Sequence, residues 1–277
     1  MIRNCQDSPF EVLTFDLQLM TYGGIYTVFG ISGRGYDMST SVFSPDGRIF
    51  AAEYAKKAVE QGATSIGILC KDGVVLLAEK KLMPLQEPDS VEKISKIDSH
   101  IAVATSGLMA DARYLIREAR THTQSYWLSY DEPITAEALA DFICEVKAAR
   151  LSIALELPDY SQLPPGRPFG VAMIISSVDF DDSPQLIVTD PVGTSWGYMA
   201  TVIGRGSSRA GAYLEEHYKP SVTVSKGVEL ALAALRETGN TELTPENVEI
   251  AKIPVKTKEF ERLTHDEIKA LLESGTE

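Results

Sequence analysis

The sequence contains few cysteines, and this scarcity excludes two kinds of covalent framework. Of its 277 residues, three are cysteines, Cys5, Cys70 and Cys144, and none belongs to a CxxC motif or a cysteine–histidine cluster. An odd number of widely spaced cysteines supports neither a disulfide framework nor a zinc site. We therefore expect a protein of a reducing compartment with no metal centre.

Positive charge is also scarce. The chain has 39 acidic and 26 basic residues, so its formal net charge at pH 7 is -13. General electrostatic binding to nucleic acid needs a basic surface, and an acidic membrane surface would repel such a chain. We expect neither nucleic acid nor membrane as a partner.

A long hydrophobic run is missing as well. The apolar stretch LQLMTYGGIYTVFGI (17–31) is short and contains three glycines, whereas a helix that crosses a bilayer needs about 20 apolar residues. Acidic residues before this stretch remove the positive region of a secretory signal. We interpret residues 1–35 as a disordered extension or a wrongly placed start of the gene, and residues 36–277 as a single domain.

The rest of the chain alternates between pairs of strands and pairs of helices. Apolar periodicity and turn residues predict helices over 50–61, 108–125, 135–155, 207–218 and 225–238, with a last one after Thr264. They predict strands over 64–70, 74–80, 100–107, 169–179, 185–190, 193–204 and 246–255.

This order of elements differs from the regular alternation of a parallel βαβ fold. Two antiparallel sheets packed face to face, each with helices on its outer face, would bury all of the apolar runs. The sequence therefore predicts an α+β fold in four layers, an αββα sandwich.

Such a sandwich often carries a threonine nucleophile that uses its own α-amino group as the base. The candidate here is Thr64, at the start of the first predicted strand. Ala63 precedes it, so the Gly-Thr bond whose cleavage would expose a threonine is absent, and a predicted helix lies just upstream. The chain has the frame of this kind of hydrolase without its reactive end.

Other catalytic chemistry finds little support. The four histidines, His100, His122, His217 and His265, lie outside any GxSxG or cysteine–histidine context. The segment GRGSS (204–208) lacks both the GxGxxG pattern and the lysine of a phosphate-binding loop. Its glycines more simply allow the chain to turn from a strand into a helix.

Several long motifs resemble a known family. The segments VFSPDGRIFAAEYA, SVEKISKIDSHIAVATSGLMADARYLI, RPFGVAMI and TDPVGT are similar, in order and spacing, to those of a 20S proteasome alpha subunit. The resemblance runs from about Tyr36 to the C-terminal helix, and QSYWLSYDEPIT (124–135) is most similar to the type-5 alpha subunit. It implies the N-terminal-nucleophile hydrolase fold, an extra N-terminal helix over 50–61, and no catalytic residues.

The resemblance also implies an axial gate. Tyr36, Asp37, Pro45 and Tyr54 match the cluster that holds the pore of the family open. Proline fixes φ and so directs the chain at the turn, while a carboxylate can accept hydrogen bonds from tyrosine hydroxyls. Met38 stands where the family usually has arginine, so a gate contact through that charge is not expected here.

A second implied site is a pocket between neighbouring alpha subunits. In the family it receives the C-terminal tail of an activator, whose carboxylate meets a lysine. Lys93 matches that lysine, and Gly62 and Leu108 match positions that line the pocket. A compact ammonium suits a single carboxylate in a recess.

We therefore expect a non-catalytic alpha-ring subunit of the 20S proteasome, which controls the gate and docks activators in ubiquitin-dependent degradation. The implied partners are neighbouring alpha subunits, beta-ring subunits, the regulatory particle and unfolded substrates in transit; no cofactor is implied. The implied location is cytoplasm and nucleus. Two alternatives stay open: an active hydrolase formed by removal of residues 1–63, and a homoheptameric scaffold ring.

Overall fold

The computed structural model describes residues 43–152, 167–239 and 243–274. The extension proposed for residues 1–35 lies outside these ranges, and so do Tyr36, Asp37 and Met38. The predicted end of the second long helix, at residue 155, also lies outside the described residues.

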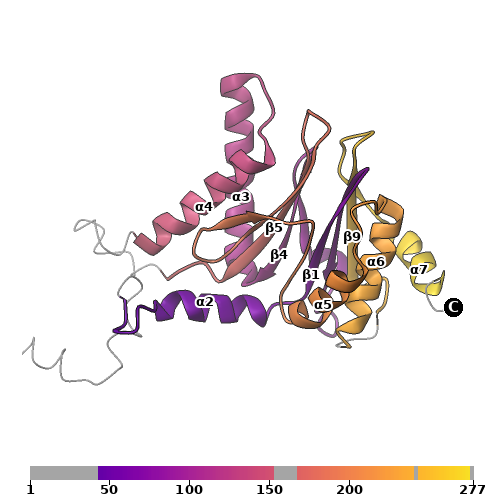
Figure 1. Ribbon diagram of the computed structural model, residues 1–277, viewed down its shortest axis with the longest axis horizontal. Coiled ribbons are helices and arrows are strands. Elements are labelled where there is room, and N and C mark those ends of the chain that lie inside the picture. Colours follow the sequence, from indigo (N-terminus) through magenta and orange to yellow (C-terminus); the bar gives the residue numbers. More distant parts are fainter. Residues whose placement is uncertain (1–42, 153–166, 240–242, 275–277) are drawn as a thin grey trace, which may run out of the picture.

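Two five-stranded antiparallel sheets form the centre of the described structure (Figure 1). The first has the order β10-β9-β2-β1-β8, with β1 Ser65–Cys70, β2 Gly73–Glu79, β8 Ala200–Ile203, β9 Val248–Pro254 and β10 Glu261–Arg262. The second has the order β3-β4-β5-β6-β7, with β3 Ile94–Asp98, β4 Ile101–Gly107, β5 Val171–Val178, β6 Pro184–Thr189 and β7 Ser195–Gly197.

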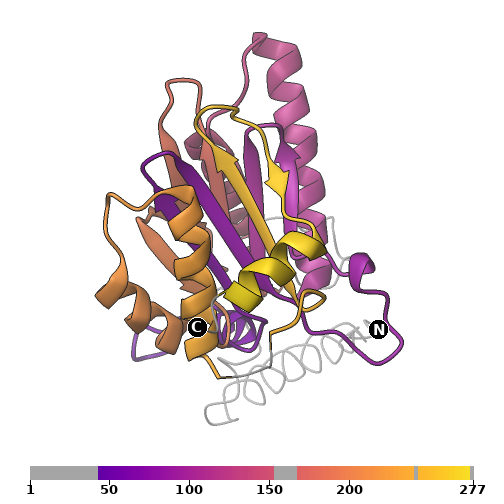
Figure 2. The same ribbon diagram turned by 90° about the vertical axis from the view of Figure 1, so that its right-hand side faces the viewer.

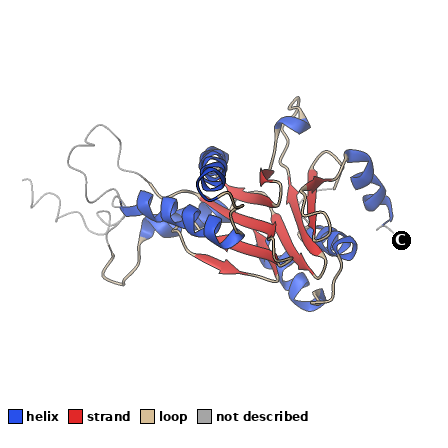
Figure 3. Cartoon of the chain, turned by 90° about the horizontal axis from the view of Figure 1, so that it is seen from above, coloured by secondary structure: helices blue, strands red, loops and turns tan. Residues whose placement is uncertain are grey.

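Helices cover the outer face of each sheet, and seen from above they surround the strands (Figure 3). The first sheet carries α5 Ser207–His217, α6 Val224–Glu237 and α7 His265–Ser274, which share one apolar core with it. The second sheet carries α3 Met109–Tyr130 and α4 Ala136–Ser152, which share another. The predicted four-layer α+β sandwich is therefore confirmed.

A third apolar core lies between the two sheets. Its closest approach is at Gly67, where a Cβ would lie 2.8 Å from the Leu186 side chain and 2.9 Å from that of Ile174. A glycine on β1 thus lets the sheets come together without an overpacked core.

The remaining helix, α2 Phe50–Glu60, lies apart from these layers and packs against β4 and β5 at one end of the sandwich (Figure 1). It contributes Val59 to the core between the sheets. It is the helix predicted over 50–61, and its position leaves the side of α2 that carries Tyr54 and Lys57 exposed.

Several local signals act as predicted. The Thr135 hydroxyl accepts a hydrogen bond from the Ala138 N–H at 3.3 Å and caps α4. At α7, the Thr264 N–H donates to Glu267 at 2.8 Å, and the Glu267 N–H donates to the Thr264 hydroxyl at 3.4 Å. This reciprocal pair is the predicted capping box.

The single strand predicted over 193–204 is wrong, because the chain changes sheets within it. β7 pairs with β6 in the second sheet, whereas β8 pairs with β1 in the first. At the crossing, the Tyr198 N–H donates to the Leu186 carbonyl, and the Met199 carbonyl accepts from the Leu69 N–H, both at 2.8 Å. An apolar run carries no mark of where a chain leaves one sheet for the other.

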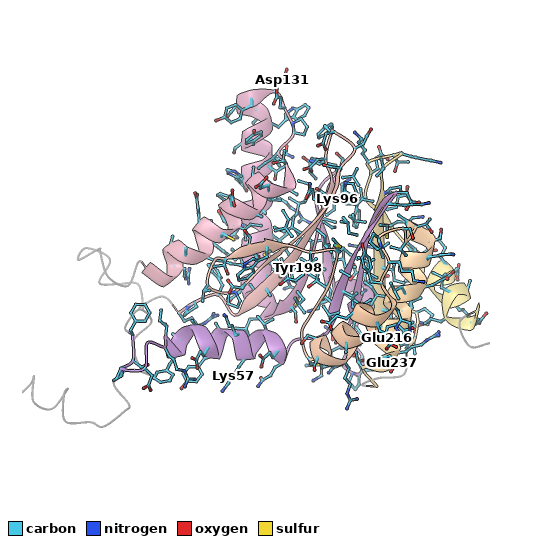
Figure 4. All side chains as sticks on the ribbon, viewed as in Figure 1. Lys57, Lys96, Asp131, Tyr198, Glu216 and Glu237 are labelled. Atoms are coloured by element: carbon cyan, nitrogen blue, oxygen red, sulfur yellow. The ribbon has the colours of Figure 1, made fainter. Side chains whose placement is uncertain are left out.

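Two further expectations need correction. β3 was not predicted, because it is short and its register shifts between Lys96 and Asp98, so it lacks a clean alternation. α3 continues to Tyr130 instead of ending at 125, although its last buried residue is Thr123. The apolar stripe ends before the helix does, and Figure 4 shows Asp131 at the projecting tip.

Candidate functional site

Lys93 lies just before β3, and its side chain is buried at 5% exposure. Its ammonium nitrogen lies 3.8 Å from the Met109 sulfur, and its backbone N–H donates to Glu249 Oε2 at 2.9 Å. Burial lowers the pKa of Lys93 to about 8, although the carboxylates of Glu249 and Glu79 act in the opposite direction. The lysine is therefore charged at neutral pH but holds its proton weakly.

Gly62 and Leu108 lie at the junction between β4 and α3. A side chain at Gly62 would collide with the Ser106 hydroxyl and the Gly107 backbone nitrogen, so only glycine fits there. Leu108 precedes α3, is 44% exposed, and donates its N–H to the Gly170 carbonyl at 2.9 Å.

The structure thus brings the three candidate pocket residues to one place. Gly62 packs against the end of β4, Leu108 follows that strand directly, and Lys93 contacts the first residue of α3. An apolar side chain, an approachable backbone and a buried ammonium lie around a single strand–helix junction. Such a set can receive a carboxylate together with a flanking apolar group.

A buried charge network supports this junction, and sequence reasoning missed it. Glu249 is 3% exposed, and its oxygens lie 3.2 Å from Arg262 and 3.9 Å from Lys80. Burial raises the pKa of the Glu249 carboxyl, while the Lys93 N–H and the nearby cations act against it. Glu79, 2% exposed, pairs with Arg205. The available signal was a glutamate within each of two otherwise apolar strands.

Thr64 is buried beside the same network. Its hydroxyl accepts a hydrogen bond from the Gly206 N–H at 3.2 Å, and its own backbone N–H donates to Glu79 Oε2 at 3.4 Å. The carbonyl of Ala63 accepts from the Ser106 hydroxyl at 3.0 Å. The Thr64 nitrogen is therefore a peptide nitrogen held in the strand, and it cannot act as a base as an α-amino group can.

Two of the four candidate gate residues lie in the described part of the chain. Pro45 is the second residue of a turn in which the Gly47 N–H donates to the Ser44 carbonyl at 2.8 Å. Tyr54, on α2, is 49% exposed, and its ring centroid lies 6.5 Å from that of Phe50. Since Tyr36 and Asp37 lie outside the described residues, the gate cluster stays a prediction.

The histidines take part in packing or lie at the surface. His100 is buried with Nε2 2.9 Å from the Ile134 carbonyl, and His122 stacks on Phe142 with ring centroids 3.8 Å apart. His217 stacks on Tyr213, and His265 lies 3.6 Å from Asp89. Across the described ranges, no group of three or more possible metal ligands occurs, and no helix has the length and apolarity to span a bilayer.

The glycines of GRGSS act as predicted. Gly204 has φ +96°, in the left-handed region, and a Cβ there would lie 2.7 Å from the Ala63 carbonyl oxygen. The segment turns the chain from β8 into α5, which explains its glycines without a bound phosphate.

Comparison with known proteins adds independent findings. The family model described as "Proteasome subunit" matches residues 59–253, and the model for the N-terminal signature of A-type proteasome subunits matches residues 36–58. The chain is 43% identical over 244 residues to the proteasome alpha subunit of Archaeoglobus fulgidus, which covers 88% of this chain and 94% of the relative. It is 44% identical over 239 residues to the protein of the same name in Methanocaldococcus jannaschii, covering 86% and 87%.

Proposed function

The chain belongs to the proteasome alpha-subunit family, and we propose that it acts in the ring as a non-catalytic subunit that controls the axial gate and docks activators. The proposed partners are neighbouring alpha subunits, beta-ring subunits, the regulatory particle and unfolded substrates of ubiquitin-dependent degradation. The proposed location is cytoplasm and nucleus.

One observation carries the docking part of this proposal, namely the convergence of Lys93, Gly62 and Leu108 at the β4–α3 junction. A tail carboxylate placed beside the Lys93 ammonium would supply the oxygen partner that it lacks among the described residues. Binding would also offset the unfavourable burial of the charge, because a nearby carboxylate stabilises the protonated form.

Exchange of Lys93 for methionine tests this proposal. Lys93→Met keeps most of the side-chain volume and removes the charge, so assembled particles should bind an activator tail peptide about tenfold more weakly or worse. Lys96→Met is the matched control, because Lys96 is exposed three residues further on, and it should bind like wild type. The same peptide with an amidated C-terminus should not distinguish wild type from Lys93→Met.

Unchanged binding of the carboxylate peptide to Lys93→Met particles, at a pocket shown to be occupied in wild type, would refute the assignment. A gain of discrimination by Lys96→Met instead would move the site to the exposed face of β3.

The absence of activity of its own is the second part of the proposal. It is supported by Thr64, whose nitrogen lies within the chain and whose hydroxyl is engaged by Gly206. Intact-mass measurement of the protein from native particles should show no cleavage before Thr64. A chain that begins at Thr64 and reacts covalently with a threonine-directed inhibitor would establish the hydrolase alternative.

Ring composition is the third part, and here we propose a type-5 subunit in a ring of different alpha subunits. Its support is the similarity of residues 124–135 to that type. The relatives from Archaeoglobus fulgidus and Methanocaldococcus jannaschii carry the name alpha without a subtype, which favours the homoheptameric ring as a second candidate. Native mass spectrometry of endogenous particles separates the two, because a homoheptameric ring would contain this chain alone.

A further inference from the structure

A groove runs along α3 on the side that faces β3. Its volume is about 460 Å³, and Arg113, Arg117 and Arg120 line one wall. Met109 and Ile116, from the same helix, contribute its apolar surface. In Figure 2 the chain leading into β3 passes beside α3, and the two elements are in contact.

The three arginines form a stripe, because they are four and three residues apart on one helix. Their own partners leave them available. Arg117 lies 3.6 Å from Glu118 and over the ring of Tyr114, and the Arg120 side chain donates to the Lys96 carbonyl at 2.9 Å. Arg113 forms no salt bridge within the described residues, all of which belong to a chain with a net charge of -13.

One carboxylate also lines the groove, that of Glu92. It is already paired with Arg262 at 2.5 Å, on the β10 side. The groove therefore combines three guanidinium groups with one carboxylate whose charge is compensated elsewhere. A concave basic surface on an acidic protein focuses attraction for negatively charged groups.

We infer that this groove binds an extended, acidic segment of a protein partner, with carboxylates at alternating positions. Along the helix axis, Arg113 and Arg117 are separated by about 6 Å, and alternate side chains of an extended peptide are separated by about 6.6 Å. Guanidinium groups bind carboxylates through two parallel hydrogen bonds, so each arginine can take one acidic side chain.

The same spacing argues against two other ligands. A single phosphate is too small to reach all three arginines, which extend over about 10 Å of helix. Nucleic acid would meet the long-range repulsion of a strongly acidic chain. The apolar surface of Met109 and Ile116 instead suits a small apolar side chain between two carboxylates.

A labelled peptide of alternating glutamate and alanine, titrated against the full-length chain and followed by fluorescence anisotropy, tests the inference. Arg113→Gln with Arg117→Gln should weaken binding about tenfold, because two charge-assisted contacts are lost. Lys226→Gln, at an exposed position of α6, changes the charge elsewhere and should change binding less than twofold. Arg113→Lys keeps the charge but not the fork, and should fall between them.

Each outcome bears on the inference. All three residues of the variants lie at the surface, so thermal unfolding should match wild type and loss of binding can be read directly. Equal loss in the double variant and in Lys226→Gln would overturn the groove as the site. Displacement of the peptide by millimolar inorganic phosphate, or tighter binding of a single-stranded oligonucleotide, would overturn the peptide as its ligand.

Discussion

Lys93 and Lys147 are both buried lysines, yet their surroundings differ. Lys147, on α4, is fully buried and has four oxygen acceptors: Thr189 Oγ1 at 2.8 Å and the carbonyls of Asp190, Val171 and Thr189 at 3.1, 3.2 and 3.4 Å. Lys93 contacts a sulfur at 3.8 Å. Burial lowers both pKa values, to about 7 for Lys147 and about 8 for Lys93.

The comparison separates a structural lysine from one that is suited to a ligand. Lys147 joins α4 to the start of β5 and the end of β6, and its hydrogen-bonding capacity is used within the fold. The Lys93 ammonium is desolvated without an equivalent set of oxygens among the described residues. A buried charge that lacks strong partners is poised to gain from an incoming carboxylate.

The largest expected effect follows from the loss of the Lys147 ammonium. Lys147→Met would leave buried acceptors of β5, β6 and the following turn without a donor, and we expect the free energy of unfolding to fall by about 3 kcal/mol. Lys93→Met should lower it by less than about 1 kcal/mol, because no oxygen acceptor is orphaned. Urea unfolding of the two variants measures the difference. Equal losses would remove the distinction between the two lysines.

A smaller effect is expected from Gly62, which closes the Lys93 region through backbone packing. Gly62→Ala would force a Cβ against Ser106 and Gly107, and we expect a loss of about 2 kcal/mol. Gly211→Ala is the matched control on α5, where a Cβ meets nothing within 4 Å; it should stabilise by about 0.5 to 1 kcal/mol. Thermal unfolding compares them, and a neutral Gly62→Ala would contradict the close packing.

The smallest effect concerns pH. The pKa of Lys93 is lowered to about 8 from 10.5 by burial, so the unoccupied site loses its proton as pH rises through that value. Binding of a tail carboxylate needs the ammonium and should therefore weaken above about pH 8, by up to tenfold per pH unit. An ordinary lysine would keep its charge to about pH 10.

Tail-peptide titrations of assembled particles at several pH values measure this dependence. Lys93→Met provides the control, because its weak binding should not change with the same midpoint. A wild-type affinity that stays constant until the ordinary lysine range would show that the Lys93 ammonium is not desolvated in the ring.

Much of the local structure follows from short signals in the sequence. The caps at Thr135 and Thr264 and the Asp72-Gly73 turn act between neighbours in the chain, so they identify helix starts and a hairpin without knowledge of the rest. Lys147 also left a readable signal that was missed. It follows Ile143 by four residues on the apolar stripe of α4, and a charge on such a stripe requires buried partners.

The sequence by itself determined the four layers, most of the helices and strands, and the family, because these depend on periodicity and motifs along the chain. Tertiary structure decided that residues 195–203 divide between two sheets, that Glu79 and Glu249 support Lys93, and that three arginines share a groove with β3. The physical reason is that hydrogen-bond partners and burial depend on segments far apart in sequence, which a local pattern does not specify.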